Sequence, residues 1–139
     1  MSEERRAEQP APIYGPGPWS ERYTYAPAVR VGNLLFFSGT TGTDDNNCIV
    51  APGDIVEQTR QIYRKFDKIL RSLGTSCEAI VQTVDHITTT ENYKGTARVR
   101  REFIKHANTA ATGVIVAGLL REGALIEITA IAVLPGDRA

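Results

Sequence analysis

The stretch ALIEITAIAVLP, from Ala124 to Pro135, decides the fold of this chain. Successive side chains of a strand point to opposite faces, and both alternating sets are apolar here except for Thr129 and one carboxylate, Glu127. This pattern predicts a central strand that is covered on both faces of its sheet. Because an acid in such a strand needs partners or a cavity, Glu127 is the first candidate for chemistry.

The composition of the 139 residues fits one ordinary domain. Sixteen basic and sixteen acidic residues give zero formal charge, which argues against a nucleic acid or an anionic membrane as partner. No apolar run reaches the roughly 18 residues of a membrane span, and the N-terminus lacks the apolar run of a signal peptide. Cys48 and Cys77 form no CxxC pair, and His86 and His106 are too far apart to suggest a metal site. We therefore expect a cytoplasmic protein with no metal or other cofactor.

Residues 1–20 are polar at first and then rich in proline and glycine. Such a segment has too little apolar surface to order itself, so we expect a flexible N-terminal arm that Trp19 pins to the body. Residues 21–139 then form a single domain.

Hydrophobic periodicity and turn residues divide this domain into seven elements. The expected elements are strands over 29–31 and 34–37 joined at Gly32-Asn33, a helix over 55–73, a strand over 80–89, a helix over 92–107, and strands over 112–119 and 125–134 that form a closing hairpin around Arg121-Glu122-Gly123. The first helix is the best defined, since Asp54 and Glu57 can form a capping box and Gly74 suits its C-terminal end.

The order β-β-α-β-α-β-β predicts an α+β fold, in which two helices cover one face of a mixed sheet. The strands near Phe36, Val116 and Ile128 are nevertheless apolar on both faces. Because no segment is left to cover the second face, we expect another copy of the chain to cover it. A closed dimer or trimer is then the default, with any ligand cleft between subunits.

Four segments, AVRVGNLLFFSG, ILRSLGTS, QTVDHITTTENY and ALIEITAIAVLP, resemble in order and spacing the RidA/YjgF family of reactive-intermediate deaminases. The resemblance covers about Arg22 to Pro135. It implies a chorismate-mutase-like fold that forms homotrimers, with a site in each intersubunit cleft. It also implies hydrolysis of enamines and imines to ketoacids and ammonia, or action on aminoacrylate or aminomuconate.

The resemblance assigns catalytic roles to two residues of this chain. The family's glutamate in the last strand falls on Glu127, and its tyrosine before the first hairpin falls on Tyr25. Ser38 and Gly39 match the residues that line the cleft.

One family residue has no counterpart, so the resemblance is to a divergent member. The arginine that holds the substrate carboxylate lies in a proline-alanine-arginine-serine segment, which aligns with residues 110–113 of this chain. Thr112 and Gly113 therefore line that part of the site. A threonine hydroxyl cannot replace an arginine that forms two hydrogen bonds with a carboxylate. This argues against the small iminoacids as substrates. Arg22, Arg121 or an arginine of the second helix of a neighbouring chain can take that carboxylate instead.

Imine hydrolysis needs a held water, a group that moves protons, and contacts that place the substrate. An apolar cleft disfavours a charged carboxylate, which suits Glu127 to acid and base work. Tyr25 can hold the substrate or deliver a proton. Asp85 and His86 point to opposite faces of their strand, and His86 is an additional base if it faces the cleft. The structural alternatives are an acid tied to backbone amides for Glu127, interface packing for Tyr25 and a hydrogen-bonded boundary histidine for His86.

These observations favour a metal-independent hydrolytic deaminase of an enamine or imine, such as an aminomuconate-like catabolic intermediate. The alternative is a non-catalytic trimer that binds or senses a small metabolite in the same cleft. Ribonuclease activity has been attributed to family members and ranks third here. The basic residues that would bind RNA form a stripe without aromatic platforms, which is typical of a solvated helix face. That stripe consists of Lys94, Arg98, Arg101 and Lys105.

Overall fold

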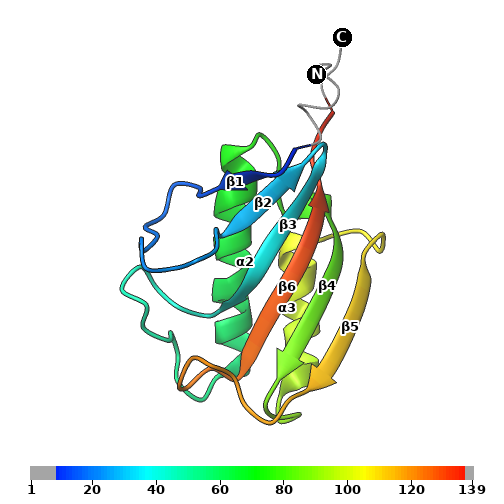
Figure 1. Ribbon diagram of the computed structural model, residues 1–139. Coiled ribbons are helices and arrows are strands. Elements are labelled where there is room, and N and C mark those ends of the chain that lie inside the picture. The colour runs from blue at the N-terminus through cyan, green and yellow to red at the C-terminus, as the bar shows by residue number, and fades with distance from the viewer. Residues whose placement is uncertain (1–8, 137–139) are drawn as a thin grey trace.

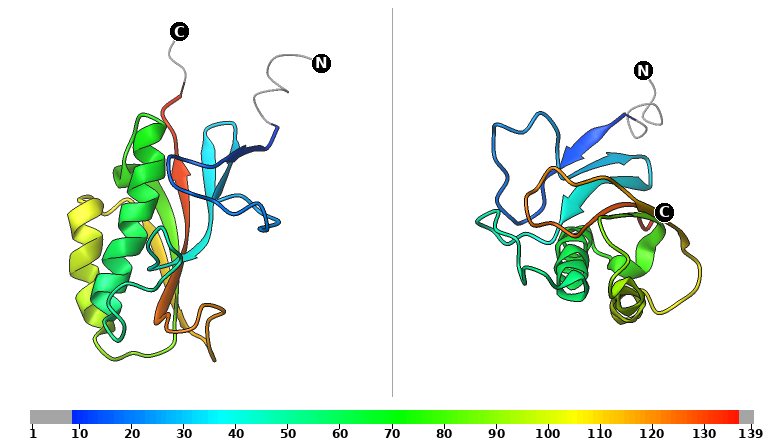
Figure 2. Two further views of the ribbon diagram at one scale, coloured as in Figure 1. Left: turned by 90° about the vertical axis from the view of Figure 1, so that its left-hand side faces the viewer. Right: turned by 90° about the horizontal axis from the view of Figure 1, so that it is seen from below.

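The structure is a computed structural model that describes residues 9–136. Its elements are β1 (Ala11–Ile13), β2 (Ala28–Val31), β3 (Leu34–Thr41), α2 (Ile55–Ser72), the 3₁₀ turn η1 (Cys77–Ala79), β4 (Ile80–Ile87), the 3₁₀ turn η2 (Tyr93–Gly95), α3 (Thr96–Phe103), β5 (Ala110–Ile115) and β6 (Ile126–Val133). The strands form one six-stranded sheet in the order β1-β2-β3-β6-β4-β5. Both helices cover the same face of this sheet (Figure 1, Figure 2). The predicted α+β architecture with a mixed sheet is therefore confirmed.

The predicted closing hairpin is wrong. Strand β5 pairs with β4 in parallel, from Gln82↔Ala110 to Ile87↔Ile115, and so lies at the edge of the sheet. Strand β4 separates it from β6, with which β4 pairs antiparallel. The physical reason is that α3 forms the crossover between β4 and β5, and such a crossover returns the chain parallel to the strand it left.

The N-terminal arm contains a strand that the sequence pattern did not predict. Residues 1–8 of the arm lie outside the described residues, but β1 pairs antiparallel with β2, with Pro12 opposite Val29. Proline cannot donate a hydrogen bond to a second neighbour, and it is tolerated here because β1 is an edge strand.

The core lies between the sheet and the two helices. Ile126, Ile128, Ala130 and Ala132 of β6 are buried, and so are Ile62, Phe66 and Leu70 of α2. The rings of Phe37 and Phe66 join the layers, with centroids 4.5 Å apart. Glu127, Thr129 and Ile131 of β6 are only partly buried, and Val133 is exposed. The helices thus cover one face, and the face that carries Glu127 is open in a single chain.

Helix α2 begins at a side-chain cap, as predicted. The Asp54 carboxylate accepts hydrogen bonds from the backbone N–H groups of Val56 and Glu57, both at 3.1 Å. The Glu57 side chain pairs with Arg60 rather than reaching back to Asp54, so the expected capping box is only half formed. A nearby arginine offers the carboxylate a stronger, charge-assisted partner than a backbone amide.

Replacing this cap should weaken the fold measurably. Asp54→Ala leaves two amide groups at the start of α2 without their acceptor, so we expect the free energy of unfolding to fall by about 1 kcal/mol. Asp54→Asn keeps an acceptor oxygen and should lose much less. Urea unfolding monitored by circular dichroism measures both, and an Asp54→Ala variant as stable as the wild type would show that the cap is unimportant.

Candidate active site

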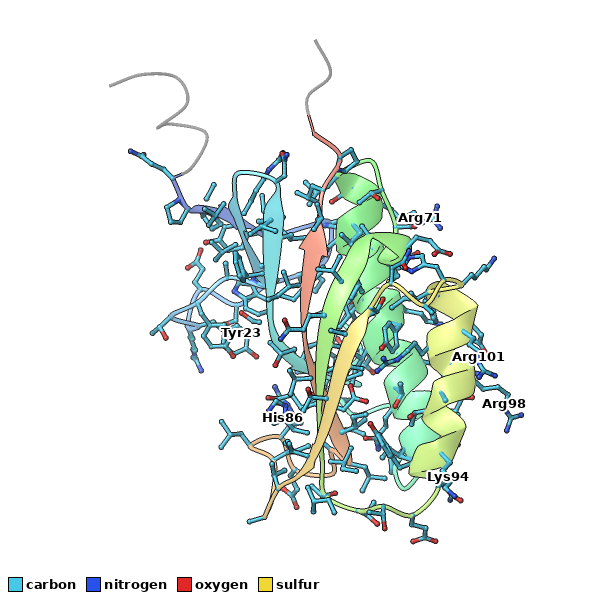
Figure 3. All side chains as sticks on the ribbon, turned by 90° about the vertical axis from the view of Figure 1, so that its right-hand side faces the viewer. Tyr23, Arg71, His86, Lys94, Arg98 and Arg101 are labelled. Carbon is cyan, nitrogen blue, oxygen red and sulfur yellow. The ribbon has the colours of Figure 1, made fainter. Side chains whose placement is uncertain are left out.

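Glu127 lies on the open face of the sheet, near the start of the central strand β6. In the strand register it stands opposite Thr41 of β3 and opposite His86 of β4. Residues that face each other on neighbouring strands project from the same face, so Glu127 and His86 both point away from the helices. Figure 3 shows His86 on that side of the sheet. The structure thus brings together two of the three candidates for proton transfer, Glu127 and His86.

The imidazole of His86 is incompletely satisfied. Its Nδ1 atom is buried, and no described residue forms a hydrogen bond with it. A buried polar atom without a partner costs roughly 1–3 kcal/mol, so a ligand, a water or a second protein chain at this position would stabilise the site. The role of His86 in the site stays a prediction.

Gly39 lies in contact with the Glu127 carboxylate. The pairing of β3 with β6 shifts between Phe37 and Thr40, and Gly39 sits in this bulge. A Cβ atom on Gly39 would lie only 2.8 Å from Oε1 of Glu127, so a larger residue would displace the carboxylate. Bulges beside functional groups commonly serve to aim a side chain.

Ser38 is held by the backbone next to this bulge. Its hydroxyl donates to the carbonyl of Ala26 at 2.7 Å, and its N–H donates to the carbonyl of Pro27 at 2.9 Å. Ser38 remains predicted to line the cleft. Its two hydrogen bonds also have a structural effect, because they tie the second half of β3 to the segment before β2.

Thr112 and Gly113 lie on opposite faces of β5. Thr112 pairs with Val84 and therefore shares the open face with His86. Gly113 pairs with Asp85 and faces the helices, where a Cβ atom would lie 2.9 Å from the hydroxyl of Tyr93. The place of Thr112 in the site stays a prediction, whereas Gly113 provides space for the Tyr93 ring.

Tyr25 and Arg22 lie in the segment before β2, and both are exposed. The Tyr25 ring packs 5.4 Å from Tyr23 and 5.7 Å from Trp19, measured between centroids. Within the described part of the chain, no hydrogen bond or ion pair joins Tyr25 or Arg22 to Glu127. Their assignment to the site therefore remains a prediction.

Asp85 forms a separate polar cluster on the helix side of β4, opposite to His86 as the alternation predicted. The hydroxyl of Tyr93 donates to its Oδ2 atom at 2.7 Å, and Nη2 of Arg100 lies 3.8 Å from the same oxygen. Arg100 also donates to the hydroxyl of Thr83 at 3.0 Å. Burial raises the pKa of Asp85, while Tyr93 and Arg100 oppose that effect. This cluster anchors α3 and η2 to the sheet.

Lys65 of α2 is a charged residue that the sequence analysis missed. Its ammonium group donates to Thr40 Oγ1 at 2.5 Å, to the carbonyl of Thr41 at 2.9 Å and to Thr43 Oγ1 at 2.8 Å. All three acceptors are neutral. Burial, with a smaller effect of Arg121, lowers the pKa of Lys65 to about 8, although Asp45 acts in the opposite direction. In the sequence Lys65 is one of many charges on a helix, and nothing marks it as buried.

The described residues contain no group of three or more His, Cys, Asp or Glu side chains that could hold a metal ion. The side chains gathered around Glu127 are instead those of acid–base and hydrogen-bonding chemistry.

The sequence and the fold match a known family. A family model described as Endoribonuclease L-PSP matches residues 19–134. The chain belongs to the RidA/YjgF family. This RidA/YjgF chain is 33% identical over 110 residues to a protein of Acinetobacter baylyi named 3-aminoacrylate deaminase RutC, covering 78% of this chain and 85% of that protein.

Two further RidA/YjgF relatives extend this picture. A protein of Mus musculus named 2-iminobutanoate/2-iminopropanoate deaminase is 28% identical over 109 residues, covering 78% of this chain and 80% of that protein. The crystal structure of YyfA from Yersinia pestis, a Rid-family protein of unknown function, matches with a TM-score of 0.81 and 28% identity over 91% of this chain and 100% of that one. Deaminase activity on imines and enamines is thus a property of named members of the family.

The environment of Lys65 predicts a pH dependence of stability. Its pKa is about 8 in the folded chain against an ordinary value of 10.5, so between these two pH values the unfolded chain binds more protons at this residue. The free energy of unfolding of the wild type should therefore rise with pH over this interval relative to Lys65→Met, on the order of 1–3 kcal/mol. Urea unfolding of both proteins at pH 7.5, 9 and 10.5 tests this. A difference that stays constant or falls would contradict it.

Proposed function

We propose that this chain is a hydrolytic deaminase of an enamine or imine, which releases ammonia and leaves a carbonyl product. The observation that supports this most directly is the position of Glu127, which lies opposite His86 on the open face and in contact with Gly39. The deaminase names of the relatives from A. baylyi and Mus musculus support the same reaction class. The residues needed for proton transfer are thus present in a chain of the right family.

In this reaction Glu127 moves protons between water and nitrogen. A protonated imine carbon is already electrophilic, so the ionised Glu127 takes a proton from a water molecule as the oxygen bonds to that carbon. The carbon–nitrogen double bond becomes a single bond, and nitrogen receives the proton from Glu127. The carbon–nitrogen bond then breaks while Glu127, again a carboxylate, takes the proton of the new hydroxyl group. Ammonia leaves and the carbonyl forms, so that one water is consumed for each ammonia released. His86 and Thr112 position the substrate, and a metal ion is not needed for these steps.

A homotrimer would complete the site in this proposal. The open face exposes apolar side chains that no other part of the described chain covers. They are Leu34, Phe36, Val114 and Val133, each 39–45% exposed. Contiguous apolar surface of this kind usually marks an interface. In a closed symmetric assembly this face is buried on every subunit. We place Tyr25 and Arg22 of one chain near Glu127 of its neighbour, where they can contact the substrate.

Glu127→Gln tests the catalytic proposal. The amide keeps the size of the side chain but cannot take up a proton, so ammonia release from an enzymatically generated imine or aminoacrylate should fall about 100-fold or more. Glu122→Gln changes an exposed acid of the loop before β6 and should leave the rate unchanged. Turnover that persists in Glu127→Gln would refute the role of this residue.

Phe36→Arg tests the assembly. A charge on the apolar open face should prevent the chains from associating, and sedimentation velocity should then report monomers that retain the helical circular dichroism signal. Arg101→Glu makes an even larger charge change on the solvated face of α3, away from the open face, and should leave the oligomer intact (Figure 3). If Phe36→Arg sediments like the wild type, the open face is not the interface.

A non-catalytic metabolite-binding trimer is the second candidate. It is favoured by Thr112, which occupies the position where the family resemblance expects an arginine. Saturable binding of an imine analogue, with no ammonia release from any imine or enamine substrate tested, would decide for this alternative.

The cellular location that we propose is the cytoplasm, because both cysteines are free thiols and fit a reducing compartment. One relative, protein mmf2 of Schizosaccharomyces pombe, is named as mitochondrial. Among the described helices, none is both long and apolar enough to cross a membrane. Nucleic acid remains a disfavoured partner on the grounds of zero net charge.

A further inference from the structure

A pocket lies within a single chain, between the N-terminal arm and helix α2. Its volume is about 670 Å³, within the range typical of small-molecule sites. The walls are formed by the arm, by the end of β3 at residues 37–40, by the loop at residues 43–47 and by α2. The arm is fixed over the helix at Gly15, whose φ is +72° and where an added Cβ atom would lie 2.7 Å from Cγ1 of Ile69. The pocket therefore exists because the arm packs on α2.

One wall of this pocket is aromatic and rigid. Trp19 and Tyr23 line it, together with Pro16 and Pro18, and the two aromatic ring centroids are 4.7 Å apart. The indole N–H of Trp19 donates to the carbonyl of Tyr25 at 2.9 Å, which fixes the ring plane. A fixed pair of aromatic rings offers a planar apolar group both stacking and burial.

The part of the lining that α2 contributes is cationic, because Arg64, Lys65 and Lys68 all line the pocket. Lys65 is bound only to neutral oxygens, so its charge is not cancelled. In the described chain Arg64 and Lys68 form no ion pair, in contrast to Arg60, which pairs with Glu57 and Glu102. These three cations gather on one side of the pocket and can attract an anion.

The acids at the pocket do not cancel this charge. Asp44 and Asp45 both lie on the loop that closes one end of the pocket, and both are exposed. The Asp44 carboxylate already accepts hydrogen bonds from the backbone N–H groups of Asn46 and Cys48, at 2.8 and 3.0 Å. Three cations against two solvated acids give the pocket a preference for negative charge.

We propose that this pocket binds a carboxylic acid that carries an aromatic ring, with the ring against Trp19 and Tyr23 and the carboxylate at Arg64 and Lys68. The site goes beyond the proposed deaminase activity, since it needs neither Glu127 nor a second chain. It is nevertheless adjacent to the candidate active site, because Gly39 lines the pocket and also contacts Glu127. Both groups that the ligand needs, an aromatic surface and a cluster of cations outside any ion pair of the described chain, line the same pocket.

Phenylacetate is the probe that tests this site in the full chain. Trp19 is the only tryptophan, so its fluorescence reports directly on the pocket. We expect a saturable fluorescence change with phenylacetate. Phenylacetamide, which lacks the charge, and acetate, which lacks the ring, should each bind about tenfold more weakly or worse. Isothermal titration calorimetry gives the same affinities without relying on the fluorophore.

Matched variants locate the contacts. The double variant Arg64→Gln/Lys68→Gln should weaken phenylacetate binding about tenfold or more, and because both side chains are exposed its circular dichroism spectrum should not change. Arg98→Gln/Arg101→Gln removes the same charge from the outer face of α3 and should bind phenylacetate as the wild type does (Figure 3).

Three results would overturn the proposal. These are the absence of saturable binding up to about 10 mM phenylacetate, equal affinity for phenylacetate and phenylacetamide, and unchanged affinity in Arg64→Gln/Lys68→Gln. Glu127→Gln separates this proposal from the deaminase proposal, because the variant should lose ammonia release but bind phenylacetate within about twofold of the wild type. Lost phenylacetate binding in that variant would show that the pocket is not an independent site.

Discussion

The central position of β6 is the constraint on which the rest of the structure depends. Its even-numbered residues from Ile126 to Ala132 are buried beneath the helices, and its odd-numbered residues occupy the opposite face. A shift of one residue in the register would bury Glu127 in the helix-side core and expose the isoleucines, which would be very costly. The apolar alternation therefore fixes the register, and the register determines that Glu127 stands opposite His86 and Thr41.

The candidate site also depends on the bulge in β3. Position 39 has no room for a side chain, since a Cβ atom there would lie 2.8 Å from Oε1 of Glu127. Glycine at this position therefore lets the backbone of β3 approach the carboxylate closely. Lys65 holds the strand beyond the bulge by donating to Thr40 and Thr41. A buried ammonium from α2 and a carboxylate on the open face thus lie on either side of the same short piece of backbone.

Much of the fold could be predicted from the sequence, because periods of two and of about 3.6 identify strands and helices. They predicted α2 from Asp54 onward and placed Asp85 and His86 on opposite faces of β4. The periods do not predict which strands become neighbours. The sequence pattern therefore predicts that β5 pairs with β6, whereas in the structure the crossover through α3 places β5 beside β4. Lys65 and the pocket were missed because a helical pattern identifies a polar face but does not reveal which loop or arm folds over it.

The arm explains why the polar face of α2 differs from that of α3. Lys94, Arg98, Arg101 and Lys105 are exposed, and water and salt weaken their influence on any ligand. Arg64, Lys65 and Lys68 belong to a similar set of basic residues, but the arm and the loop at 43–47 enclose the surface around them. Partial exclusion of water strengthens the interaction of these cations with an anion. The proline-rich segment, which has little apolar surface of its own, thus creates a charged pocket by packing at Gly15 against Ile69.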